Sequence, residues 1–340
     1  MTESQELIEV FDARAQRRTD RRAMFKALAG ATVLGAGIAM ATSVDAQTVT
    51  DADILNFALN LEYLEANFYY YAAFGTPIPA ASITGVGTPV PAAAAANSSG
   101  TLYNAGARAV SFSDPSVAAY AREIAADEYN HVTFLRTALG ASAVAQPALD
   151  VGITPTGAFS SAARAAGLIP SAATGTAQTS FFDPYANDAN FLYGAFIFED
   201  VGVTAYKGAS SLLTNKTYLD AAAGILAAEA YHAAIVRTSL DQLGIATPKI
   251  RLDIEAISNA RDSLDGTTDD DQGIAQITTN PVGTVSNIAP TDGNGLAYGR
   301  TTGQVLNIVY LNAPSKVGAT SGGFFPAGVN GNIKTSTANG

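Results

Sequence analysis

The chain has 340 residues, with 19 Lys and Arg against 30 Asp and Glu, and its formal net charge of -11 argues against nucleic acid or an anionic membrane surface as a partner. It contains no cysteine, which excludes disulfides, thiolate ligands and iron–sulfur clusters, so any metal must be held by oxygen and imidazole. The length suits one large domain, or a core domain with an appendage.

Residues 1–46 resemble an export signal of the twin-arginine type. Arg21 and Arg22 stand just before an uncharged stretch rich in Ala, Gly and Leu, and cleavage is expected between Ala46 and Gln47. The alternatives are an ordinary secretory signal or an uncleaved anchor, although the apolar stretch is shorter than the roughly 20 residues that a spanning helix needs. We therefore expect the twin-arginine export machinery to deliver a folded protein to a bacterial periplasm or cell exterior, with no membrane insertion after cleavage.

Four long helices are predicted within residues 47–250, and together they suit a four-helix bundle with a buried centre. Their expected ranges, bounded by capping residues, glycines and prolines, are 50 or 51 to 74, 115–139, 184 or 188 to 213, and 217–243 with Gly244 as the stop. The long connections at 75–112 and 140–182 are rich in Ala, Gly, Pro and Ser and are expected to pack over the bundle. The short third connection makes the last two helices antiparallel neighbours.

The only two histidines, His131 and His232, lie in the second and fourth predicted helices. Each has a glutamate three residues earlier, Glu128 and Glu229 respectively. Because positions three apart share a helix face, the carboxylate and the imidazole of each pair can reach the same point in space. For either pair alone, a plain surface hydrogen bond is the competing interpretation.

The other two helices each carry a Glu followed seven residues later by a Tyr, and these pairs are Glu62 with Tyr69 and Glu199 with Tyr206. Seven residues are almost two helical turns, so each pair shares a face. The chain order is thus Glu, Glu-x-x-His, Glu, Glu-x-x-His, which is the pattern of di-metal carboxylate bundles. Four carboxylates would be costly to bury unpaired, and two divalent cations would neutralise them. Carboxylate and imidazole ligands suit Fe, Mn or Zn, and the first two allow redox work with oxygen or peroxide. We expect two metal ions, iron first and manganese second.

Several neighbouring side chains allow more than one role. Glu65 shares a face with Glu62 and is either a further carboxylate of the site or a salt-bridge partner of Arg108 or Arg122. Tyr69 and Tyr206 either hydrogen-bond the ligands or simply pack. Asp127 and Asp200 are expected to be solvated, although each could also reach an imidazole of the neighbouring helix. Arg136 and Arg237 are expected to pair with acidic residues.

Residues 251–340 are expected to form a short helix at 252–264 and then a tail rich in Gly, Thr and Asn that packs on the bundle. The stretch 304–311 is apolar enough to dock, and Phe324 and Phe325 could do so as well. Nothing in the composition marks this region as a separate domain.

The order of these Glu and His motifs resembles the ferritin-like superfamily. The stretch LEYLEANFYYYA and the FFPAGVNG segment resemble its exported branch, which is related to plant desiccation-induced proteins. This resemblance covers roughly residues 48–245 and implies an all-α, ferritin-like four-helix bundle. It implies six metal ligands, namely Glu62, Glu128, His131, Glu199, Glu229 and His232. The long first connection, and Gly202 at the place equivalent to Glu65, depart from the family pattern and argue against a ferritin-style cage.

Three classes of function follow. The first is a di-iron or di-manganese oxidoreductase acting on O2, H2O2 or Fe(II), in the manner of a ferroxidase, peroxidase or catalase. The second is a metal-binding stress or desiccation-related protein without turnover, and the third is a structural or surface-interaction protein that retains the bundle. The sequence has no Gly-rich phosphate loop, no nucleophile motif and no basic patch, so only a small inorganic substrate is named. It carries no indication of an oligomeric state.

Overall fold

The computed structural model describes residues 49–171, 181–266, 268–278, 282–312 and 318–337. The expected export signal, including Arg21, Arg22 and the Ala46–Gln47 junction, lies outside these residues. The described part has no extended strands and only isolated bridges, so the all-α prediction is confirmed. Its α-helices are α2 (Asp51–Phe74), α3 (Pro115–Leu139), α4 (Ala158–Ala165), α5 (Asp188–Ser210), α6 (Lys216–Ala246), α7 (Lys249–Asp265) and α8 (Thr302–Val309). Three short 3-10 turns lie at Ala80–Ser82, Ala92–Ala94 and Gly140–Ser142.

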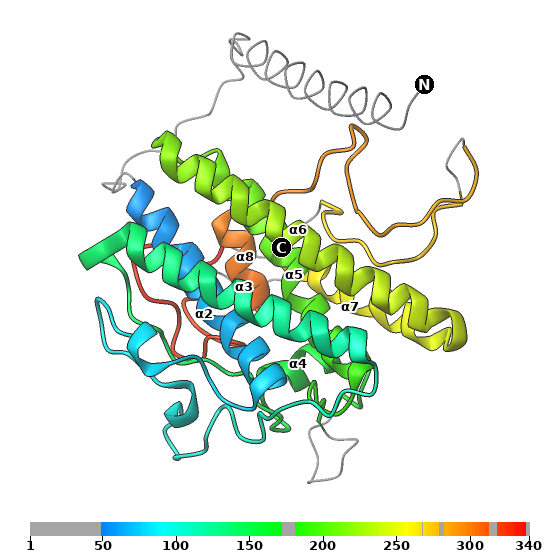
Figure 1. Cartoon of the computed structure of the whole chain (residues 1–340), viewed down its shortest axis with the longest axis horizontal. Helices are drawn as coiled ribbons and strands as arrows, with labels where there is room; N and C mark the ends of the chain where they lie inside the picture. Colours follow the sequence, from blue (N-terminus) through cyan, green and yellow to red (C-terminus); the bar gives the residue numbers. More distant parts are fainter. Residues whose placement is uncertain (1–48, 172–180, 267, 279–281, 313–317, 338–340) are drawn as a thin grey trace, which may run out of the picture. The chain divides into compact units, whose positions relative to one another are not determined.

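The four long helices α2, α3, α5 and α6 form the bundle, with α2 packed along α3 and α5 packed along α6 (Figure 1). Every residue from 53 to 69 of α2 is buried, and α5 is buried almost as completely. Neither helix presents an exposed polar face, since even their polar residues are largely buried, as expected of helices enclosed by their neighbours. In contrast, α3 and α6 keep an exposed face, so the bundle centre lies beneath them.

The helix ends follow from their capping residues. Thr50 and Asp53 form a capping box that satisfies the first backbone amides of α2, and Gly75 ends this helix with a φ of 75°. At α3, Asp114 accepts a hydrogen bond from the amide of Ser116, and the following proline occupies the first helical turn. These caps are the ones expected from the sequence.

Three details of the prediction were wrong. Helix α6 does not stop at Gly244 but continues to Ala246. Gly244 instead leaves room for Arg251 of α7, since a Cβ at this glycine would stand 2.6 Å from Cγ of that arginine. Helix α5 ends at Ser210, before the expected 213. The connection at 140–182 contains a helix that was not predicted, α4, whose eight residues are too few for a clear apolar period.

The C-terminal region packs against the bundle through apolar side chains. Helix α7 follows α6 directly, and α8 contacts α5 and α7. The rings of Phe324 and Phe198 have centroids 4.9 Å apart, and Phe325 is fully buried. The expected docking of the stretch at 304–311 and of the two phenylalanines is therefore present, and the docking stretch is largely helix α8.

The two equivalent arginines of the repeat both fix connecting segments onto the bundle. Arg136 donates hydrogen bonds to the hydroxyl of Tyr63 and the carbonyl of Thr84, so its expected acidic partner is wrong. Arg237 is fully buried and pairs with Asp200 at 2.8 Å, as expected. Its other N–H groups donate to four carbonyls of the C-terminal region, those of Gln272, Gly273, Asn287 and Ile288. One guanidinium thus joins two loops of the tail to α6.

By length and composition alone, α6 is the single helix of the described residues that could cross a membrane. Its buried face carries Glu229 and His232 toward the bundle centre. The same helix therefore supplies two of the six residues of the polar cluster considered next.

Candidate metal centre

The four bundle helices bring the six expected ligands to one place. Glu62 comes from α2 and Glu199 from α5, while α3 and α6 each supply one Glu-x-x-His pair. All four carboxylates and His232 are buried, and His131 keeps a side-chain exposure of 12%. The helical repeat of the sequence is therefore a repeat in space.

The cluster divides into two groups of possible ligand atoms. The first consists of Glu62, Glu128, His131 and Glu229, and the second of Glu128, Glu199, Glu229 and His232. In each group, one nitrogen or carboxylate oxygen per residue lies within 4.8 Å of the others. Glu128 and Glu229 belong to both groups. They stand where bridging ligands of two neighbouring cations would stand.

Both imidazoles direct Nδ1 into the cluster. Nδ1 of His131 lies 3.2 Å from Oε2 of Glu62 and 3.5 Å from Oε2 of Glu128. Nδ1 of His232 lies 3.1 Å from Oε1 of Glu128 and 3.5 Å from Oε2 of Glu199. The two oxygens of Glu128 thus face different histidines, and the centre has an approximate two-fold arrangement.

The inward atoms of the cluster face one another at ion-pair distances, but they form no hydrogen bond with any of the described residues. These are Oε2 of Glu62 and Glu199, both carboxylate oxygens of Glu128 and Glu229, and Nδ1 of His131 and His232. Buried polar groups are almost always paired, because an unpaired one loses its hydration without compensation. Eight unpaired atoms aimed at one region fit a site for cations, and the mixture of oxygen and imidazole ligands suits Fe, Mn or Zn.

The pKa values show how strongly the cluster depends on charge compensation. Burial raises the pKa of Glu62 to about 7, although His131 opposes this shift, and burial also raises the pKa of Glu229 well above its usual range. Burial lowers the pKa of both imidazoles, but the facing carboxylates outweigh it and raise the pKa of His131 to about 11 and of His232 to about 12. Without metal, protons on the imidazoles provide the compensating charge. A metal ion would have to displace them.

Two buried tyrosines hold the single-Glu ligands from behind. The hydroxyl of Tyr69 on α2 donates to Oε1 of Glu199, and the hydroxyl of Tyr206 on α5 donates to Oε1 of Glu62. Each bond crosses between α2 and α5 and leaves the other oxygen of the carboxylate, Oε2, free to face the cluster. The Glu-to-Tyr spacing of seven residues produces this reciprocal pairing.

Glu65 faces the cluster and not an arginine. It is buried, and of its two suggested partners Arg108 pairs with Asp183 at 2.7 Å, so the expected alternative of a salt bridge to Arg108 is wrong. Its Oε1 lies 3.5 Å from the place that a Cβ of Gly202 would occupy, and Oε2 of Glu229 lies 2.2 Å from the same place. Gly202 therefore leaves the room into which the carboxylate of Glu229 fits.

The two aspartates beside the ligands behave differently from each other. Oδ2 of Asp127 lies 3.2 Å from Nε2 of His232, with a side-chain exposure of 44%, so it reaches the imidazole of the neighbouring helix. Asp200 is buried and binds Arg237 and Arg261, and the expectation that it is solvated was wrong.

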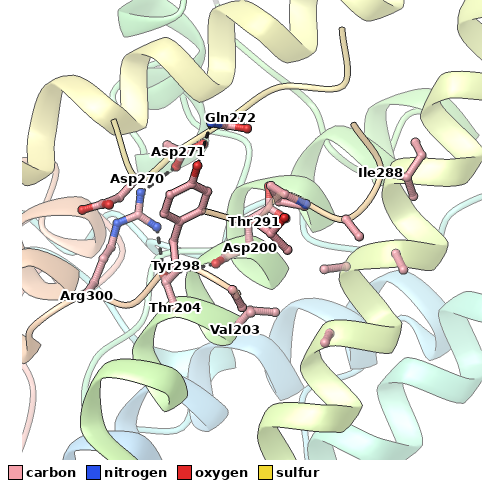
Figure 2. Close-up of a pocket in the computed structure, with 16 residues that line it drawn as sticks. Asp200, Val203, Thr204, Asp270, Asp271, Gln272, Ile288, Thr291, Tyr298 and Arg300 are labelled. Atoms are coloured by element: carbon pink, nitrogen blue, oxygen red, sulfur yellow. Dashed lines mark hydrogen bonds and ion pairs between the residues drawn. The ribbon is translucent and has the colours of Figure 1, made fainter. Parts of the chain in front are cut away.

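Asp200 belongs to a buried ionic network that sequence reasoning missed. Arg261 also binds Asp271, and Arg300 binds Asp271 and Asp265. Only Asp200 and Arg237 were singled out beforehand, because the other charges lie beyond residue 250, far along the chain from the Glu and His motifs. Beside the network lies a mainly apolar cavity of about 140 Å³ between α5, α6 and the tail (Figure 2). Its walls include residues adjacent in sequence to the ligands, such as Ala230 and Ala233, on a different face of α6.

Comparison with known proteins places this geometry in context. A family model described as a ferritin-like domain matches residues 50–242. The chain is 29% identical over 271 residues to the desiccation-related protein PCC13-62 of Craterostigma plantagineum, covering 76% of each protein. It is 26% identical over 296 residues to the ferritin-like catalase Nec2 of Nesocodon mauritianus, covering 83% of this chain and 84% of that protein. No solved structure gives a significant match.

Proposed function

The chain belongs to the ferritin-like domain family, and from this premise we propose that it is a di-metal carboxylate protein that acts on H2O2, O2 or Fe(II). Glu62 and His131 would hold one ion, Glu199 and His232 the other, and Glu128 and Glu229 would lie between them. Iron is the first choice of metal and manganese the second, because both accept oxygen and imidazole ligands and both change oxidation state.

The observation that carries this proposal is the set of unpaired inward atoms on the six ligands. The four ligand carboxylates carry four negative charges when ionised, and two divalent ions match them. A structural bundle centre would gain nothing from such residues, since apolar side chains of similar volume would fill the space without a desolvation cost.

H2O2 is the preferred substrate, because one relative is a ferritin-like catalase. A bound metal pair would supply two-electron redox chemistry, by which one H2O2 would be oxidised to O2 with release of two protons and another reduced to two H2O with uptake of two protons. The protein's own contribution is positioning. Tyr69 and Tyr206 fix the single-Glu ligands, and the buried helices α2 and α5 limit access by water.

A non-catalytic stress protein is the second candidate, because another relative is a desiccation-related protein. In that case the ions would mainly stabilise the bundle, since any ligand that binds only the folded state stabilises it. Oxygen release from H2O2 separates the two candidates.

We further propose export by the twin-arginine route to a periplasm or cell exterior, on the basis of residues 1–46 alone. Replacement of both Arg21 and Arg22 by Lys should leave the protein in the cytoplasm. Unchanged export of that variant would contradict the route.

The decisive test is elemental analysis of the protein purified from its native location, beside a His131→Ala/His232→Ala double variant. We expect about two Fe or Mn per chain and little in the variant, as for other two-metal carboxylate bundles. With metal content known, oxygen evolution from H2O2 is measured on the same samples. A folded native sample without Fe or Mn would contradict the proposal.

A further inference from the structure

The two halves of the metal centre repeat each other closely, but their histidines are not supported equally. We propose that the two metal positions are inequivalent, and that the position of His232 and Glu199 binds a divalent ion more tightly than the position of His131 and Glu62. This inference rests on the proposed function, because it assumes that the cluster holds metal at all.

The first observation is the contact between Asp127 and His232. Nδ1 of this histidine faces the cluster, and its other nitrogen, Nε2, lies 3.2 Å from Oδ2 of Asp127. A carboxylate at this place accepts a hydrogen bond from Nε2–H, which fixes the tautomer with a free lone pair on Nδ1. It also orients the ring and makes Nδ1 a stronger donor to a metal.

The second observation is that His131 lacks such support. In the repeat, Asp127 precedes Glu128 on α3 exactly as Ala228 precedes Glu229 on α6, so an alanine stands where the second aspartate would be. Among the described residues, Nε2 of His131 has no hydrogen-bond partner. The side chain of His131 is also the more exposed of the two, at 12% against 4% for His232.

The other departure from the repeat does not favour either position. Glu65 and Gly202 are equivalent by sequence, and Oε1 of Glu65 lies beside the carboxylate of Glu229. Because Glu229 belongs to both groups of ligands, an extra carboxylate next to it acts on both ions. The inequivalence therefore depends on Asp127.

The experiment isolates each metal position by removing the glutamate that belongs only to the other position. Glu62→Ala leaves the His232 position intact, and Glu199→Ala leaves the His131 position intact. The metal-free full-length variants are titrated with Mn(II) by calorimetry, with folding verified by circular dichroism. We expect tighter Mn(II) binding to Glu62→Ala. Adding Asp127→Ala, which copies the residue of the other half, should weaken it by about 10–100-fold in this background and leave Glu199→Ala unchanged.

The reciprocal change supplies a gain of affinity. Ala228 is half-buried, as Asp127 is, so an aspartate there would stand in a similarly exposed place on its helix. Ala228→Asp in the Glu199→Ala background should bring the affinity of the His131 position toward that of the His232 position.

Each outcome has a separate meaning. If the folded wild-type chain binds no Mn(II), the proposed function itself fails. If it binds two ions, but Asp127→Ala weakens both single-position variants equally or neither, the inference alone is overturned. Should a single-position variant not fold, electron paramagnetic resonance of the wild-type chain with one equivalent of Mn(II) decides. If the wild-type spectrum is that of one isolated Mn(II) in a single environment, and Asp127→Ala spreads the ion over both positions, the inference is supported. If the ion is already spread over both positions in the wild type, the inference is overturned.

Discussion

Gly202 on α5 offers a test of the centre that removes no ligand. A Cβ at this position would lie 2.2 Å from Oε2 and 2.9 Å from Cδ of Glu229. The substitution Gly202→Ala must therefore displace that carboxylate. We expect Gly202→Ala to abolish or strongly weaken metal binding, although all six ligands are still present.

The magnitude follows from two opposing effects. Alanine is favoured over glycine inside a helix by about 1 kcal/mol, whereas an extra methyl group in a packed centre costs about 1–3 kcal/mol. The metal-free variant should thus lose no more than about 2 kcal/mol of unfolding free energy. The larger loss concerns the metal, because an ion present at 100 times its Kd stabilises the fold by about 2.7 kcal/mol, and this contribution should disappear.

Gly224→Ala on α6 is the matched control. This glycine is also helical, but it is exposed and a Cβ there would meet nothing within 4 Å. Its substitution should stabilise by about 1 kcal/mol, or raise the Tm by about 2–4 °C, with unchanged metal content. The assay is thermal unfolding with and without Mn(II), beside metal analysis. If Gly202→Ala gains as much stability as the control and keeps its Mn(II)-dependent rise in Tm, the assigned place of Glu229 is wrong.

Four further predictions concern the ligands and the groups around them. Tyr206→Phe removes the hydrogen bond to Glu62 and should cost about 1–3 kcal/mol in denaturant unfolding and about 10–100-fold in metal affinity; unchanged values in both would exclude a positioning role. Arg237→Met should cost about 3–5 kcal/mol and speed hydrogen exchange in the tail loops that this arginine holds, and equal exchange rates would contradict that role. Because the pKa values of His131 and His232 are raised to about 11 and 12, and burial raises the pKa of Glu62 to about 7 and of Glu229 well above its usual range, two ions should displace at least two protons near pH 7, measured by calorimetry in buffers of different ionisation enthalpy. The raised pKa values of the two histidines also stabilise the metal-free fold. This stabilisation is complete below pH 6.5 and is lost as the pH rises through 11, so the Tm of the metal-free protein should fall over this range. A constant Tm would show that the imidazoles are not protonated.

The bundle and the six clustered residues could be predicted because their information is local. A Glu and a His three residues apart must share a helix face whatever the rest of the chain does, and the same holds for a Glu and a Tyr seven apart. The capping signals at Thr50 and Asp114 are local as well. Four such elements in the right order then require only that the helices pack around one centre.

The errors concern contacts between side chains of different elements. From the sequence alone, Gly244 predicts the end of its helix. The structure shows that Arg251 of the following helix packs against this glycine. The sequence around Asp200 predicts a surface residue. Its partner Arg261 and the tail loops lie more than 60 residues further along the chain, so the sequence of α5 alone does not indicate the buried ion pair. Such pairings depend on how the tail returns to α5, and no periodicity within one helix encodes that path.

The two halves of the repeat share some residues around the centre and differ at others. Both halves carry the Glu ligands, the histidines and the tyrosines. These are the residues that two equivalent metal positions would need. Positions that differ, Asp127 against Ala228 and Glu65 against Gly202, lie in contact with the cluster or directly beside it. Most other positions differ between the halves as well, so these two differences matter because of what they contact and not because of their number. Asp127 lies against a ligand histidine and has no counterpart in the other half, and the single-position variants measure directly what it contributes.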